Sequence, residues 1–66
     1  MKTTTLRAVE IDNVPNGEIE IVFIWENLRF TSTNIHQGTP DQVSDALMRL
    51  ARQIQDDKMA GKFDER

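Results

Sequence analysis

The segment EIEIVFIW, residues 18–25, constrains the fold more than any other part of this sequence. Successive side chains of a β-strand point to opposite sides, so this strand has one entirely apolar side and one mixed side. The apolar side carries Ile19, Ile21, Phe23 and Trp25, and the mixed side carries Glu18, Glu20, Val22 and Ile24. Such a strand belongs in a sheet that buries one face and exposes the other.

Two further strands are expected around this one, over residues 4–13 and 28–34. Only Glu26 and Asn27 separate the central strand from the third, and Asn tolerates the left-handed backbone of a tight loop, which predicts a hairpin. This hairpin places four large side chains together on the apolar side. Its pairs are Trp25 with Leu28 and Phe23 with Phe30.

The connection between the first two strands is compatible with two registers. The two registers place the carboxylates upstream of the connection on different faces of the sheet. A two-residue Asn16-Gly17 turn places Glu10 and Asp12 on the apolar side, where burying their charges costs free energy. A three-residue loop from Pro15 to Gly17, with the glycine in the left-handed conformation of a bulge, keeps both carboxylates outside. We therefore expect the bulged turn. Its pairs are Val14 with Glu18, Ile11 with Ile21 and Val9 with Phe23.

A helix start is encoded at Thr39, which is followed by Pro40 and, three residues after the threonine, by Gln42. Thr and Gln at this spacing form a capping box, and Pro is favoured in the first helical position. We expect a helix over residues 40–60 that ends at Gly61. Its apolar stripe consists of Val43, Ala46, Leu47, Leu50 and Ile54.

Together these elements predict one small domain of the α+β class over residues 1–66, with a frayed polar tail at residues 61–66. Its architecture is a three-stranded antiparallel β-meander followed by one C-terminal α-helix packed on one face, in the order βββα. The predicted core places the helical stripe against eight sheet residues: Val9, Ile11, Ile19, Ile21, Phe23, Trp25, Leu28 and Phe30.

At 66 residues the chain is near the lower limit for a domain that folds without a disulfide or a structural metal ion. Surface scaling gives about 4,300 Å² folded against about 11,000 Å² unfolded, so only about 60% of the surface is buried. There is no cysteine, hence no disulfide and no zinc site built on cysteine. The mean hydropathy is −0.53, and the N-terminus lacks the apolar core of a signal peptide. A cytoplasmic location is expected, in the host cytoplasm if a phage encodes the chain.

No combination of residues in the sequence predicts catalysis. His36 is the only histidine and lies in a polar connection, so an exposed loop histidine is favoured over a general base or a metal ligand. Ser32 and Ser44 lack a glycine-rich elbow, and the three glycines match neither a dinucleotide fingerprint nor a P-loop. We expect a protein that is not an enzyme and that uses no cofactor, no metal and no small-molecule substrate.

The sheet face turned away from the helix has two chemically different ends. The acidic end, nearest the first turn, consists of Glu10, Asp12, Glu18 and Glu20, and the apolar end consists of Leu6, Ala8, Val22 and Ile24. One interpretation is an ordinary solvated face with scattered apolar residues. We favour an interface, because one helix covers only one side of a sheet and a chain this small needs more burial. Self-association through this face or through an unpaired sheet edge supplies that burial, most simply as a homodimer.

These observations predict a small non-catalytic protein–protein interaction module, a homodimer that acts as a regulator, an inhibitor or a small assembly subunit. Compact accessory proteins of phages and mobile elements share its size and charge, which is an argument by analogy. One alternative is an acidic inhibitor that imitates nucleic acid in the binding site of a host enzyme. Another is a nucleic-acid-binding module, which a net charge of −3 opposes. Its local basic patch would consist of Lys2, Arg29, Arg49 and Arg52.

Overall fold

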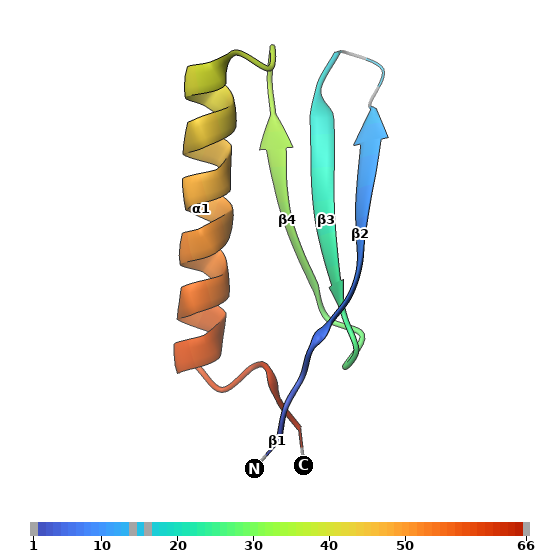
Figure 1. The fold of residues 1–66 in the computed structure, drawn as a ribbon, viewed down its shortest axis with the longest axis vertical. Coiled ribbons are helices and arrows are strands. Elements are labelled where there is room, and N and C mark those ends of the chain that lie inside the picture. Colours follow the sequence, from blue (N-terminus) through green and yellow to red (C-terminus); the bar gives the residue numbers. More distant parts are fainter. Residues whose placement is uncertain (1, 14, 16, 66) are drawn as a thin grey trace.

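The computed structural model describes residues 2–13, 15 and 17–65. The elements in chain order are β1 (Lys2–Thr3), β2 (Leu6–Asn13), β3 (Ile19–Trp25), β4 (Phe30–Ile35), α1 (Pro40–Met59) and β5 (Asp64–Glu65) (Figure 1). β2, β3 and β4 form an antiparallel meander in that spatial order, and α1 follows and packs against β4. The predicted α+β fold, a β-meander with one C-terminal helix on it, is confirmed.

The register between β2 and β3 is the predicted one along most of its length. Val9 lies opposite Phe23 and Ile11 opposite Ile21, which keeps Glu10 and Asp12 on the face away from α1. Gly17 has a φ of 84°, the left-handed conformation that the bulged turn requires. The predicted pairing of Val14 with Glu18 and the position of Asn16 lie outside the described residues.

A β-bulge changes the first part of β2. The register shifts between Leu6 and Ala8, so that Leu6 lies opposite Trp25 while Ala8 lies opposite Ile24. One extra residue in a strand reverses the sides that the residues before it occupy. The prediction that Leu6 belongs to the apolar end of the outward face is therefore wrong, because it accompanies Trp25 on the helix side of the sheet.

The β3–β4 register differs from the prediction by one residue. Ile24 lies opposite Phe30, and Phe23 lies opposite Thr31. The turn contains one residue more than expected, Leu28, which has a φ of 68°. A shift by one residue moves every side chain of β4 to the other face. The expected pairs of Trp25 with Leu28 and of Phe23 with Phe30 are wrong, and Leu28 and Phe30 are 68% and 66% exposed instead of lying in the core.

The side chain of Trp25 gives a physical reason for this register. Its Nε1 donates a hydrogen bond of 3.0 Å to Thr31 Oγ1. In the predicted register Thr31 lies on the opposite face from Trp25, and the half-buried indole N–H loses this acceptor. The observed register instead turns three residues of β4 toward α1, where they are buried: Thr31, Thr33 and Ile35.

The N-cap and the end of α1 are as the sequence predicts, but the reciprocal bond of the capping box is not formed, because Gln42 Oε1 has no hydrogen-bond partner. Thr39 Oγ1 accepts a hydrogen bond of 3.3 Å from the backbone N–H of Gln42. At the C-terminal end Gly61 has a φ of 75° and donates its N–H to the Lys58 carbonyl, while the N–H of Lys62 donates to the Asp57 carbonyl. This pair of bonds is a Schellman motif, which reverses the chain direction after the helix.

The tail is ordered, so the prediction of a frayed segment at 61–66 is wrong for its described residues. The Schellman motif turns the chain back toward the sheet, where Phe63 is buried against Trp25. The N–H of Thr4 donates to the Phe63 carbonyl at 2.7 Å, and β5 pairs with β1. Both termini therefore meet at one end of the molecule (Figure 1).

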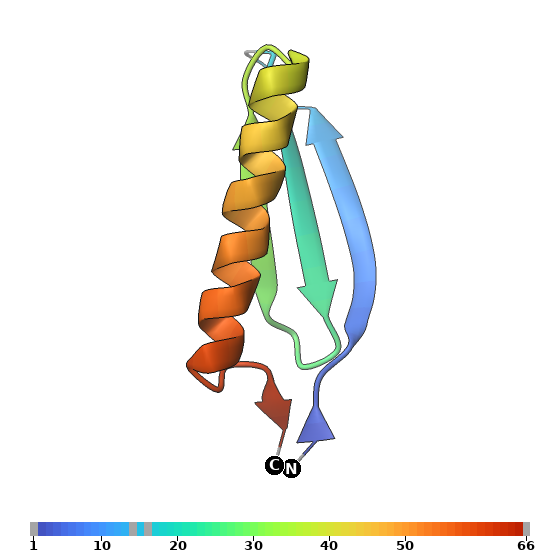
Figure 2. The same cartoon turned by 60° about the vertical axis from the view of Figure 1, so that its left-hand side comes forward.

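The core is smaller than predicted because α1 lies over the β4 edge of the sheet. Figure 2 shows α1 in front of β4, with β2 and much of β3 uncovered beside it. Val9 and Ile11, both expected in the core, are 48% and 65% exposed. The molecule measures 40 × 19 × 13 Å, and its radius of gyration of 13.1 Å exceeds the roughly 11 Å of a compact domain of this length. Among the described residues the buried apolar side chains are Ile35, Ala46, Leu50 and Phe63.

Candidate interaction surface

An uncovered apolar face lies on the helix side of the sheet, beside α1. We define it by five residues: Val9 and Ile11 of β2, Ile21 and Phe23 of β3, and Leu47 of α1. The β2 and β3 residues are direct cross-strand partners, so their side chains are adjacent on one face. The two β3 side chains are only half-buried, and Leu47 is exposed. Single exposed apolar residues are normal on a protein surface, whereas a contiguous group of large ones marks an interaction site.

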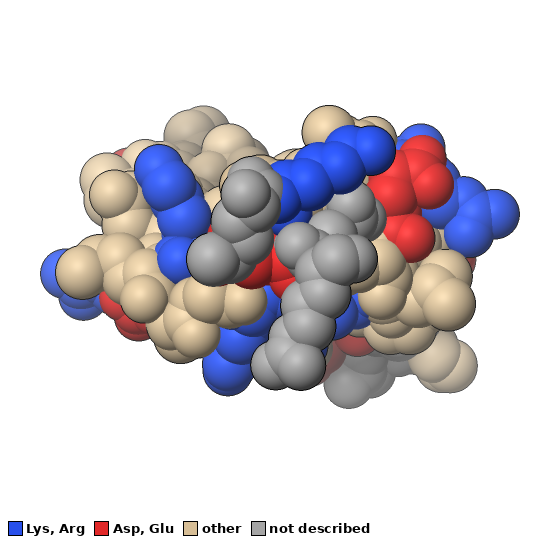
Figure 3. Space-filling model, turned by 90° about the horizontal axis from the view of Figure 1, so that it is seen from below, with Lys and Arg blue, Asp and Glu red and all other residues tan. Residues whose placement is uncertain are grey.

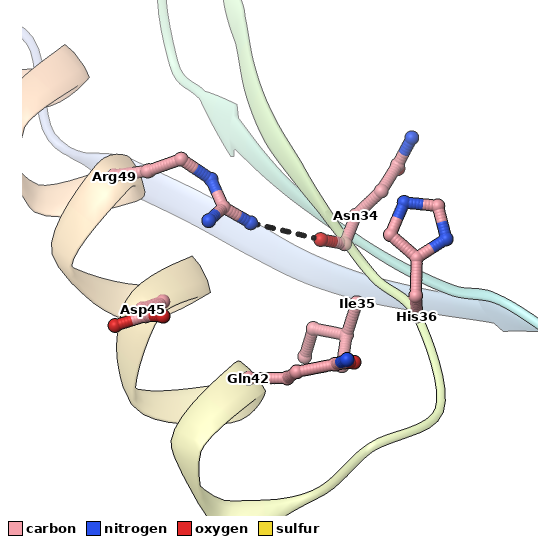
Figure 4. Close-up of a pocket in the computed structure, with 6 residues that line it drawn as sticks. All are labelled: Asn34, Ile35, His36, Gln42, Asp45 and Arg49. Atoms are coloured by element: carbon pink, nitrogen blue, oxygen red, sulfur yellow. Dashed lines mark hydrogen bonds between the residues drawn. The ribbon is translucent and has the colours of Figure 1, made fainter.

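A contact at the other edge of the sheet shows which flank of α1 faces outward. Arg49 Nη2 donates a hydrogen bond of 3.3 Å to the Asn34 backbone carbonyl of β4 (Figure 4). Residues of an α-helix follow one another at about 100°, so Leu47 lies on nearly the opposite flank of α1 from Arg49. Because the Arg49 flank faces the outer edge of β4, the Leu47 flank faces β3 and completes the uncovered apolar face.

The surface area of the chain agrees with this incomplete burial. The accessible surface is 5085 Å², compared with about 4,300 Å² for a compact monomer of this mass. The excess of roughly 800 Å² matches the area that each partner contributes to an interface of standard size, also about 800 Å². The excess is therefore of the size that one partner contributes to an ordinary interface.

The outward face, which is the sheet face away from α1, keeps the predicted division into two ends. Ala8, Ile24 and Phe30 form a cross-strand row, with Val22 one row further along β3. Phe30 was missed as a member of this face because the predicted β3–β4 register places it in the core. Toward the first turn, Asp12 lies directly opposite Glu20. Glu10, Asp12 and Glu20 thus share the acidic end of this face.

Glu18, the fourth predicted member of the acidic end, precedes β3 and contacts the loop after β4. Its Oε1 lies 2.9 Å from His36 Nδ1. The histidine side chain is mostly exposed, as expected of a loop residue. The register thus brings the start of β3 beside the end of β4, where the imidazole of His36 lies within ion-pair distance of this carboxylate.

Lys and Arg are concentrated toward one end of the long axis, whereas carboxylates occur at both ends. The sequence holds no Lys or Arg in residues 8–28 or 30–48, so the end with the β2–β3 turn and the start of α1 is rich in carboxylates. Figure 3 looks onto the other end, where Lys and Arg side chains are interspersed with Asp and Glu side chains. The six carboxylates toward the turn end are Glu10, Asp12, Glu18, Glu20, Asp41 and Asp45.

The four predicted nucleic-acid contacts are divided between two places. Lys2 in β1 and Arg29 after the β3–β4 turn lie toward the terminal end, whereas Arg49 and Arg52 project from α1. Arg49 is engaged by the Asn34 carbonyl. Arg49 and Arg52 line a hollow of about 300 Å³ together with Met48. Binding a phosphate backbone requires a continuous basic surface, and these four residues are divided between two parts of the molecule.

A small polar pocket lies between the first half of α1 and β4. Its volume is about 220 Å³, and Gln42 Oε1 is buried beside it without a hydrogen-bond partner. Its lining residues, shown in Figure 4, are Asn34, Ile35, His36, Gln42, Asp45 and Arg49.

Within the described part of the chain no group of three or more His, Cys, Asp or Glu side chains is placed to hold a metal ion. No helix among the described residues is long and apolar enough to span a bilayer.

Comparisons with models of protein families, with curated proteins and with solved structures found no match to this chain. The uncovered apolar face has three exposed apolar side chains, Val9, Ile11 and Leu47, beside the core. The outward face has an acidic end and an apolar end.

Proposed function

We propose that the chain is a non-catalytic protein-interaction module whose working form is a homodimer. The observation that carries this proposal is that α1 lies over the β4 edge and leaves Val9, Ile11 and Leu47 exposed beside the half-buried side chains of β3. In the proposed dimer, the uncovered apolar faces of two copies pack against each other. Burial of this apolar surface contributes about 25 cal/mol for each Å² removed from water.

The excess surface area favours a second copy of the chain as the partner of the uncovered apolar face. The excess surface of the chain is close to half of a standard interface, so two identical faces supply both halves. A two-fold arrangement brings the same patch of each copy together, and a patch made of Val, Ile, Leu and Phe side chains is complementary to itself. None of the five residues that define the face is charged, so its centre carries no charge that association would bury.

The dimer leaves the outward face of each copy available to another protein. Regulators, inhibitors and small assembly subunits act through such faces, and we place the chain in this broad class. The dispersed positions of Lys2, Arg29, Arg49 and Arg52 favour a protein over a nucleic acid as the partner. Fluorescence anisotropy with random-sequence DNA and RNA at low salt tests this choice, with no change in anisotropy as the expected result.

The dimer is tested by a pair of variants that receive the same new charge. Ile11→Asp places a carboxylate in the uncovered apolar face, whereas Leu28→Asp places one in the β3–β4 turn. The two residues are almost equally exposed, and the φ of 68° at Leu28 suits Asp. Sedimentation velocity should give twice 7.6 kDa for the wild type and for Leu28→Asp. Ile11→Asp should sediment as a monomer, folded or unfolded.

Two outcomes contradict the proposal. A wild type that stays at 7.6 kDa at high concentration, with the circular dichroism of a folded protein, means that no second copy is needed. Equal dissociation of both variants means that the uncovered apolar face is not the interface. Circular dichroism of Ile11→Asp over a range of concentrations distinguishes a dissociated folded chain from an unfolded one.

A further inference from the structure

The sheet has two edges, and only one of them is covered. α1 packs along β4, and Arg49 donates a hydrogen bond to the outward-pointing carbonyl of Asn34 on that strand. At the other edge, no strand among the described residues pairs with the outer side of β2, which is eight residues long. An open edge of this length presents a row of backbone donors and acceptors that another strand can bind.

The hydrogen bonds of β3 identify the backbone groups on this edge. Residues of an antiparallel strand direct their backbone groups alternately to the two neighbours. The N–H of Glu26 donates to the Thr5 carbonyl, so the even-numbered residues of β3 face β2. Their partners in β2 are also even-numbered, Glu10 among them. The N–H and C=O groups of Val9 and Ile11 therefore point to the open edge.

The side chains beside this edge differ between the two faces of the sheet. On the helix side are Val9 and Ile11, which are exposed and apolar. On the outward face are Glu10 and Asp12, two residues apart, and neither forms an ion pair with any described residue. Asp12 also lies directly opposite Glu20 on β3. Like charges in such a cross-strand pair repel each other, and a cation on an added strand relieves this repulsion.

We propose that the open edge of β2 binds an extended segment of a partner protein as an added antiparallel strand, with Lys or Arg alternating with apolar residues. The basic side chains lie on the outward face beside Glu10 and Asp12, and the apolar ones lie beside Val9 and Ile11. A second copy of β2 is a poor occupant, because it brings the same two carboxylates to the same face. This assignment rests on the proposal that the chain is a protein-interaction module, and it names the chemistry of the partner.

Synthetic peptides test the assignment. The probe is a fluorescently labelled peptide of alternating Lys and Val with blocked ends, matched to the eight residues of β2, and its counterpart replaces each Lys by Glu. Fluorescence anisotropy should show that the wild type binds the Lys peptide at least about tenfold more tightly, because two opposite-charge pairs replace two like-charge pairs. The variant E10K/D12K, which leaves the uncovered apolar face intact, should reverse this preference.

A methylated pair of peptides tests strand addition itself. In an antiparallel ladder the Val residues lie opposite Val9 and Ile11 and direct their N–H groups to β2, whereas the Lys residues direct theirs to solvent. Methylating the Val amides should abolish binding, and methylating the Lys amides should leave it unchanged. Equal binding of both methylated peptides, or no reversal by E10K/D12K, overturns the proposal.

The result is separable from the test of the dimer. The mass of the protein is measured in the same solutions by light scattering. Peptide binding to a protein of monomeric mass supports the edge site while contradicting the homodimer. A dimer that binds neither charged peptide contradicts the edge site while supporting the homodimer.

Discussion

The rings of Trp25 and Phe63 lie 4.5 Å apart, centroid to centroid, at an interplanar angle of 39°. This contact joins the end of β3 to the segment after α1, which are far apart in the sequence. Three hydrogen bonds surround it: Thr4 N–H to the Phe63 carbonyl, Asn27 N–H to Thr4 Oγ1, and Asn27 Nδ2 to the Lys62 carbonyl. The termini are thus attached to the sheet through one aromatic pair and its polar surroundings.

Replacing Phe63 by Ala should therefore be strongly destabilising although the residue is close to the C-terminus. Loss of a buried phenylalanine costs about 3–5 kcal/mol of unfolding free energy. Met59→Ala is the matched control, since it also shortens an apolar side chain near the end of α1 but at an exposed position. Its effect should stay within about 0.5 kcal/mol. Urea unfolding at equal protein concentration measures both, and equal effects mean that Phe63 is not part of the core.

Thr31 and Thr33 provide a paired test of the Trp25 hydrogen bond. Both threonines are buried on the same side of β4, but only Thr31 Oγ1 accepts the bond from Trp25 Nε1. Thr31→Val removes the acceptor and should cost about 1–3 kcal/mol, because the indole N–H is left unsatisfied. Thr33→Val should be neutral or stabilising. Chemical denaturation followed by tryptophan fluorescence checks this order, and the reverse order contradicts the observed register.

Charge substitutions on the two faces of β4 test the register more broadly. Phe30→Glu changes an exposed residue of the outward face and should leave the fold intact, with a small change in Tm. Ile35→Glu buries a carboxylate beneath α1 and should unfold the chain. Circular dichroism during heating compares the two variants. In the register expected from the sequence, Phe30 would lie in the core and Phe30→Glu would lower Tm more than Ile35→Glu.

Thr39 is the N-cap of α1, so Thr39→Ala should lower stability by about 1 kcal/mol. Its Oγ1 accepts from the Gln42 N–H, which otherwise has no partner in the first turn. Thr39→Asp restores an acceptor and adds a charge that the helix dipole favours, and it should retain the stability of the wild type. Equal losses in both variants, measured by urea unfolding, mean that the hydroxyl does not cap the helix.

The sequence predicts the β2–β3 register but not the β3–β4 register, for a physical reason. One of the two possible β2–β3 registers buries Glu10 and Asp12, and this cost decides between them. The segment FTSTNI of β4 has an apolar residue on each side, Phe30 on one and Ile35 on the other, and no charge that penalises either choice. In the observed register Trp25 donates to Thr31 and Ile35 is buried, and neither contact can be predicted from spacing or propensity.

Two parts of the molecule depend on contacts that periodicity does not encode. Phe63 is a single apolar residue in a polar tail, so its burial follows only from the Schellman motif and the proximity of Trp25. The displacement of α1 to the β4 edge follows from its packing on Thr31, Thr33 and Ile35. For this reason the exposed Val9 and Ile11, the basis of the proposed interface, were predicted as core. The charges of the outward face follow directly from the confirmed β2–β3 register.

Thermal unfolding at two protein concentrations a hundredfold apart tests most directly whether a second copy completes this fold. For a dimer that unfolds and dissociates together, the unfolding enthalpy is on the order of 90 kcal/mol of dimer at about 0.7 kcal/mol per residue. Mass action then raises Tm by about 10 °C over this range of concentration. We predict this rise, and its loss in Ile11→Asp. A Tm that is the same at both concentrations, in a wild type of monomeric mass, would contradict the homodimer.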